Sequence, residues 1–138
     1  MTITYNKINS FTNDLSSGLH NFTPSTGNQY AVVLTDTAPT ATSTSFAGEI
    51  SYANFSGSNP NYLTITSSGQ TGGTEIVKFN NLTMTATGTI PQFRYVGIKN
   101  VTTGKVVCWF DYGSELNIVA GGGLVVSFDG TNGFLQLV

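Results

Sequence analysis

The sequence predicts an all-β fold, an antiparallel β-sandwich or jelly-roll-like single domain with a short N-terminal arm. Segments with the two-residue period of β-strands cover most of residues 29–138. Helical spacing is confined to Ser10–Leu19, and no internal repeat is visible, which disfavours a propeller or a solenoid. Because the strands follow one another without alternating helices, we expect them to form antiparallel sheets.

The first 28 residues are expected to form an N-terminal arm, followed by a β-sandwich domain over residues 29–138. The arm is polar with scattered apolar residues, and it precedes the first clear strand pattern. Within it, Phe11, Leu15 and Leu19 recur every four residues and Gly18 stands where a helix would end. This spacing predicts one or two helical turns.

Nine short strands are expected after the arm, each bounded by turn residues. In the fourth, Leu82, Met84 and Ala86 alternate with threonines, which indicates one buried and one solvent-facing side. The turn residues of Asp129–Gly133 predict a tight connection between the last two strands. The expected strands are Gln29–Thr35, Tyr62–Ser67, Thr74–Phe79, Leu82–Thr87, Phe93–Asn100, Lys105–Asp111, Glu115–Ala120, Leu124–Phe128 and Gly133–Val138.

The segment Phe93–Gly113 predicts a β-hairpin that is apolar on both faces of both strands. Such a hairpin must be covered on both sides. It is therefore either the centre of a two-layer fold or half of a subunit interface. Trp109 lies among apolar neighbours and is expected to anchor the core. The Thr- and Ser-rich segment Ala38–Ser45 is expected to be an exposed connection.

Charged residues make up only 9% of the 138-residue chain, against about 25% in ordinary domains. The net charge is -2 and there is no cluster of Lys or Arg, so neither a phosphate-binding groove nor a patch for anionic membranes is expected. No apolar stretch approaches the roughly 20 residues of a membrane span, and the N-terminal sequence lacks the apolar core of a signal peptide. We therefore expect no nucleic acid or membrane partner and synthesis in the cytoplasm.

No catalytic residue, cofactor or metal site is expected. His20 is the only histidine and lies in a polar segment, where a structural role is favoured over that of a base. Cys108 is the only cysteine and falls in a predicted core strand, which favours a small buried hydrophobe. Asp111, Glu115 and Asp129 lie near strand ends but match no known calcium loop, so solvent-facing turn carboxylates are the preferred interpretation.

Three aromatic residues flank a polar loop: Tyr52, Phe55 and Tyr62. They could stack on sugar rings, but anchoring the loop to the core is the favoured interpretation. Arg94, the only arginine, falls within an apolar strand. It therefore either reaches solvent at an edge or pairs with a carboxylate such as Asp111, and an intersubunit salt bridge is its functional interpretation.

Five segments carry a resemblance in their residues, order and spacing. They are DLSSGLHNF (Asp14–Phe22), YAVVLTDTAP (Tyr30–Pro39), FRYVGIKN (Phe93–Asn100), WFDYG (Trp109–Gly113) and VSFDGTNGFLQL (Val126–Leu137). Together they resemble a family of small virion structural proteins of tailed bacteriophages. The likeness covers most of the chain from Asp14 onward. Its motifs are strand and turn patterns, so they indicate a fold family better than a place in the virion.

The resemblance implies a non-enzymatic capsid decoration or cement protein that binds and stabilises the shell of major capsid protein on the virion surface. The alternative is a tail or head-fibre component, or a carbohydrate- or receptor-binding module. The apolar hairpin favours a homo-oligomer, and the symmetry of icosahedral shells makes a trimer the expected form. The residues expected to contact the capsid or another subunit are Ile3, Tyr5, Ile8, Phe11, Phe22 and Arg94.

Overall fold

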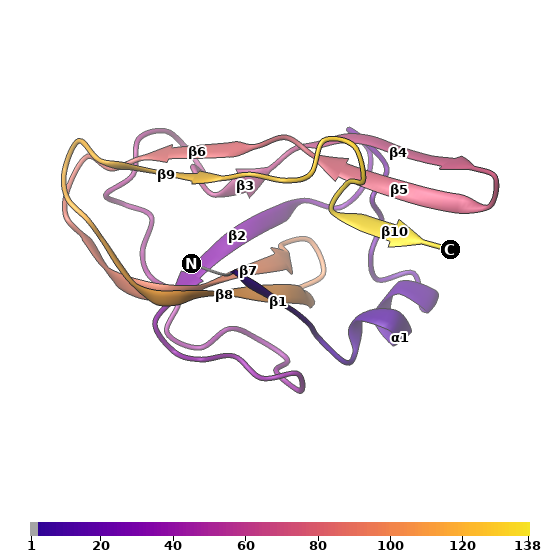
Figure 1. Ribbon diagram of the computed structural model, residues 1–138, viewed down its shortest axis with the longest axis horizontal. Coiled ribbons are helices and arrows are strands. Elements are labelled where there is room, and N and C mark those ends of the chain that lie inside the picture. The colour runs from indigo at the N-terminus through magenta and orange to yellow at the C-terminus, as the bar shows by residue number, and fades with distance from the viewer. Residues whose placement is uncertain (1–2) are drawn as a thin grey trace.

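The computed structural model describes residues 3–138 and confirms the predicted all-β, antiparallel, sandwich-like fold (Figure 1). A five-stranded sheet in the order β1-β8-β7-β2-β3 forms one layer. The other layer contains the three-stranded sheet β10-β5-β4 and the two-stranded sheet β6-β9. The elements are β1 (Thr4–Lys7), α1 (Phe11–Ser16), β2 (Tyr30–Thr35), β3 (Tyr62–Leu63), β4 (Ile65–Thr71), β5 (Thr74–Phe79), β6 (Leu82–Thr85), β7 (Ile90–Asn100), β8 (Val106–Ile118), β9 (Gly123–Val126) and β10 (Leu135–Leu137).

The second half of the chain is one long antiparallel hairpin that folds across both layers. Strand β5 pairs with β10, β6 with β9 and β7 with β8. Figure 1 shows β7 and β8 bending together toward β6 and β9. The tip is the expected turn, closed by Gly104 at φ 75°. A single hairpin therefore supplies strands to both layers and ties them together.

The observed strands differ from the predicted ones in several places. The strand expected over Tyr62–Ser67 is divided into β3 and β4, which lie in different sheets. The segments expected as separate strands on either side of Gly113 form the single strand β8, because Gly113 at φ 91° and a register shift bend the strand without ending it. The last two strands do not pair with each other as predicted. The turn at Asp129–Gly133 carries the chain from β9, beside β6, to β10, beside β5.

Both faces of the central hairpin are covered within one chain. On the inner face, β2 and β7 contribute Tyr30, Leu34 and Phe93 to the core between the layers. On the outer face, the ring of Phe46 lies so close to Gly97 that a Cβ there would overlap it. The all-buried strand β2 fits this arrangement, since it is covered on both sides. The connection around Ala38–Ser45 is largely exposed, as expected.

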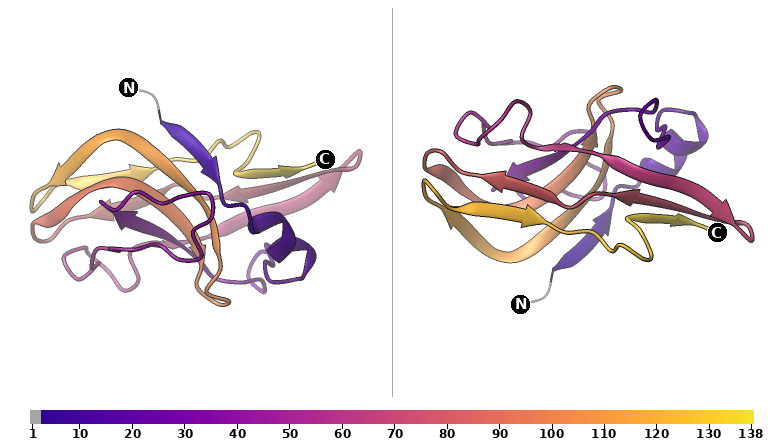
Figure 2. Two further views of the ribbon diagram at one scale, coloured as in Figure 1. Left: turned by 90° about the horizontal axis from the view of Figure 1, so that it is seen from below. Right: turned by 90° about the horizontal axis from the view of Figure 1, so that it is seen from above.

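The N-terminal segment is part of the domain and not the predicted arm. Strand β1 pairs with β8 at the edge of the five-stranded sheet, as the views in Figure 2 also show. The short helix α1 lies within the predicted range, and Gly18 follows it at φ 74°. Ile8, Phe11 and Phe22 are 0%, 4% and 7% exposed. Burying these side chains binds the segment to the sheets, which the scattered spacing of its apolar residues did not reveal.

Candidate functional site

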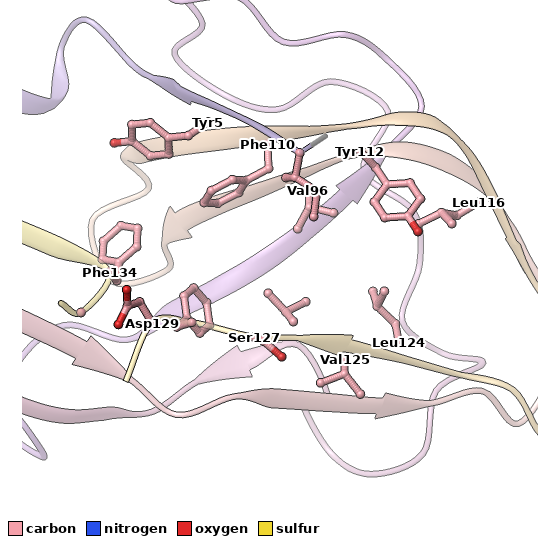
Figure 3. Close-up of a pocket in the computed structure, with 14 residues that line it drawn as sticks. Tyr5, Val96, Phe110, Tyr112, Leu116, Leu124, Val125, Ser127, Asp129 and Phe134 are labelled. Carbon is pink, nitrogen blue, oxygen red and sulfur yellow. The ribbon is translucent and has the colours of Figure 1, made fainter. Parts of the chain in front are cut away.

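An apolar groove of about 300 Å³ lies between the two layers, on the side where β1 and β9 are edge strands (Figure 3). Strands β1, β7 and β8 form one wall. Strand β9 and the connection that follows it form the other. The lining residues are Ile3, Tyr5, Val96, Phe110, Tyr112, Leu116, Leu124, Val125, Val126, Ser127, Phe128, Asp129, Gly133 and Phe134.

Aromatic packing fixes both walls of the groove. The rings of Tyr5 and Phe110 are 5.5 Å apart on the upper wall shown in Figure 3. On the opposite wall, Phe128 and Phe134 meet edge to face at 6.2 Å. Both also pack on Phe79, at 5.4 and 4.9 Å, which joins this wall to the core. The groove is therefore a formed feature of the sandwich.

The groove has few polar groups, and these can donate hydrogen bonds or carry negative charge. Burial raises the pKa of Tyr5 to about 12, with a smaller contribution from Cys108, so its phenol stays neutral and can donate a hydrogen bond. Asp129 accepts hydrogen bonds from the backbone N–H groups of Asn132 and Thr131 and from the Asn132 side chain. These bonds lower its pKa and keep the carboxylate ionised. The lining residues thus offer apolar surface, hydroxyl groups and one carboxylate.

The five predicted contact residues of the N-terminal segment separate into two groups. Ile3 and Tyr5 are 58% and 51% exposed and both line the groove. Ile8, Phe11 and Phe22 are buried in the protein's own interior, so they have no surface to offer a neighbour. For these three residues the expectation of intermolecular contact is corrected.

Arg94 pairs with a carboxylate of its own chain. Its Nε and Nη2 donate to Oδ1 and Oδ2 of Asp111 at 2.8 and 3.0 Å. This two-point hydrogen bond is the main cause of the lowered pKa of Asp111, which also accepts from the backbone N–H of Gly113. The predicted pairing of Arg94 with Asp111 is confirmed, and an intersubunit contact of the partly exposed guanidinium stays a prediction.

The loop aromatics mainly anchor their own loop, as favoured. Phe55 is 4% exposed and Tyr62 is half-buried. The Tyr52 hydroxyl donates to the carbonyl of Val32 and accepts from the N–H of Leu34, both at 3.1 Å. Tyr52 thus provides hydrogen-bond partners for backbone groups of β2 that are not paired with a neighbouring strand.

Of the residues that the sequence analysis considered for chemistry, Asp129 lines the groove, whereas His20 and Cys108 lie outside it. His20 is 5% exposed and bonds Asn100. Cys108 is fully buried, and burial raises the pKa of its thiol. Within residues 3–138, no three His, Cys, Asp or Glu side chains gather so that they could hold a metal ion. No helix in that part of the chain is long and apolar enough to span a membrane.

The sequence did not reveal the groove because its lining joins β1, at the start of the chain, to β7, β8, β9 and the connection after β9. Phe128 and Phe134 flank a turn that was expected to close a simple hairpin. Their position opposite Tyr5 depends on β9 and β10 pairing with β6 and β5. The sequence predicted the strand Leu124–Phe128 but not the elements that lie opposite it. Comparisons of the chain with protein-family models, with curated proteins and with solved structures found no match.

Proposed function

We propose that the protein is a non-enzymatic structural component of a tailed-bacteriophage virion, a decoration or cement protein that binds the major capsid protein on the outside of the shell. The observation that carries the proposal is the apolar groove at the edge of the sandwich, flanked by the exposed side chains of Ile3 and Tyr5. Exposed apolar surface of this kind favours contact with another protein. The sequence resemblance supplies the virion setting.

The character of the surface supports this role. With charged residues at 9% of the chain, contacts between neighbouring molecules require the desolvation of few ions. The long folded hairpin couples the two layers, which gives a stiff body for repeated contacts. Copies that lie side by side on the shell would also associate with one another.

A protein that binds only the assembled shell stabilises that state by mass action. Particles that lack it should therefore release their genome at a lower temperature, or under a milder osmotic shock, than complete particles. The groove can be tested by adding back protein with Tyr5→Asp, which places a charge on its rim. Added wild-type protein should restore the resistance and Tyr5→Asp should not.

Val119→Asp is the matched control, since Val119 is 66% exposed and lies outside the groove lining. This variant should protect the particles as well as wild type does. Unchanged genome release in particles without the protein would refute the cement role. Labelling that places the protein solely on the tail would do the same and would favour the alternative, a tail or host-contact component.

A further inference from the structure

Strand β1 is an edge strand with one side of its backbone left for a partner. It lies at the end of the five-stranded sheet, and its pairing within the described chain is with β8. Of the devices that often block such an edge, Thr4–Lys7 has no proline and no bulge but carries one lysine, Lys7, so a partner strand must place an uncharged or acidic residue opposite it. The edge is therefore open to pairing with another strand.

The register shows which backbone groups point outward. The N–H of Ile8 donates to the carbonyl of Val107, and the same register continues through Asn6 and Trp109. Because hydrogen-bonded and non-hydrogen-bonded pairs alternate in antiparallel sheets, Asn6 bonds toward β8, whereas Tyr5 and Lys7 direct their N–H and C=O groups to the free side. By the same alternation, the side chains of Ile3 and Tyr5 share the face that lines the groove.

We infer that β1 is a dimerisation strand, which pairs with β1 of a second copy of this chain in antiparallel fashion about Tyr5. A two-fold axis at Tyr5 joins the two Tyr5 residues as a hydrogen-bonded pair and places Ile3 of each copy opposite Lys7 of the other. Every outward-facing backbone group from Ile3 to Lys7 then has a partner. The two five-stranded sheets become one continuous sheet, and the two grooves become neighbours.

Charge favours a second copy as the occupant of this edge. The groove lining contains one carboxylate, Asp129, and neither Lys nor Arg. Strand β1 carries one cation, Lys7, and no carboxylate. Lys7 forms no salt bridge among the described residues, and the register sets it opposite the uncharged side chain of Ile3 of the other copy, so the pairing brings no like charges together. In this register the two Lys7 residues lie at opposite ends of the paired strands and do not repel each other.

This dimer does not depend on the proposed virion role, and it is tested on the purified protein alone. Sedimentation of the wild type from about 1 μM to about 1 mM should show a shift from monomer to dimer. Lys7→Pro removes one outward N–H and leaves the bonds to β8 intact, since proline is tolerated on the free side of an edge strand. It should weaken dimerisation by about tenfold or more.

Lys7→Ala is the matched control, because it removes the cation and keeps the backbone donor. It should weaken the dimer less than Lys7→Pro does. Equal effects, or a dimer that Lys7→Pro leaves unchanged, would overturn strand pairing, as would a wild type that is monomeric over the whole range. Ile3→Lys places a second cation directly opposite Lys7 of the other copy, where like charges repel, and should also favour the monomer. It keeps the test decisive if Lys7→Pro fails to fold, and a dimer that persists in this variant would contradict the inference.

Discussion

The side-chain amide of Asn100 donates a hydrogen bond to Nδ1 of His20 over 3.2 Å. Its nitrogen shares its two hydrogens with the carbonyl oxygen of Leu19 and Oδ1 of Asn28, at 3.0 and 2.9 Å, and its oxygen accepts from the N–H of Thr103. These bonds fix the direction of the amide. Nδ1 of His20 thus faces a nitrogen that can only donate, which favours the neutral tautomer with its proton on Nε2.

Acidification is expected to destabilise the fold through His20. Burial lowers the pKa of His20, an effect that Asp14 opposes and Lys105 reinforces. In the unfolded chain histidine binds a proton near pH 6.5, whereas in the fold a proton on Nδ1 would face the N–H of Asn100. The unfolded state therefore binds more protons. The free energy of unfolding should fall as the pH drops from about 6.5 to the lowered pKa and level off below it.

Denaturant unfolding at a series of pH values checks this prediction. His20→Gln is the control, since its side-chain oxygen can still accept from Asn100 and it does not titrate, so this part of the pH dependence should vanish. Hydrogen bonds from Arg94 and Asn132 lower the pKa values of Asp111 and Asp129, so those groups titrate at more acidic pH. A wild type whose stability is flat or rises on acidification below pH 6.5 would contradict the assignment.

Asn100→Ala should be strongly destabilising. Asn100 is fully buried, and its removal leaves the carbonyl of Leu19, Oδ1 of Asn28 and the N–H of Thr103 without this partner. An unsatisfied buried polar group costs about 1–3 kcal/mol, so we expect a loss of at least about 2 kcal/mol in the free energy of unfolding. Asn117→Ala, at an exposed position on β8, should stay within about 0.5 kcal/mol. Similar values for the two variants would show that the cluster is not structural.

Local patterns predicted most strands but not how distant strands pair. The alternation of Leu82, Met84 and Ala86 with threonines is reproduced, with Met84 and Ala86 at 0% and 2% exposure. Strand β1 was missed because three of its four residues, Thr4, Asn6 and Lys7, are polar and show no strand alternation. Its structure comes from pairing with β8, more than 100 residues later in the chain, and such tertiary pairing overrides local propensity.

Which apolar side chains are buried was harder to predict, because burial also depends on long-range contacts. Ile8 and Tyr5 are both isolated apolar residues in the polar N-terminal segment. Nevertheless, Ile8 is fully buried and Tyr5 is half exposed. Trp109 was expected in the core, but it is only partly buried, on β8 opposite Gly97. Which apolar residues remain at the surface is decided by which elements cover them. That information lies in long-range contacts and not in the local sequence.

The thiol of Cys108 should be unreactive in the folded protein. It is fully buried, and burial raises its pKa, so the thiolate that reacts with alkylating agents is scarce. Labelling should therefore be slow in buffer and rapid in denaturant, and mass spectrometry of the alkylated protein measures both rates. Rapid labelling under native conditions, with the fold intact by circular dichroism, would show that β8 opens locally.

Gly97 and Phe46 should behave as a coupled pair. A methyl group at Gly97 would overlap the Phe46 ring, so Gly97→Ala should cost about 1–3 kcal/mol in the free energy of unfolding. Combined with Phe46→Ala, it should cost less than the sum of the two single changes, because the overlap is gone. Gly69→Ala is the matched control on β4, where a Cβ meets nothing within 4 Å. If Gly97→Ala were as harmless as Gly69→Ala, Phe46 would not cover the outer face of the hairpin, and that face would again be a candidate subunit interface.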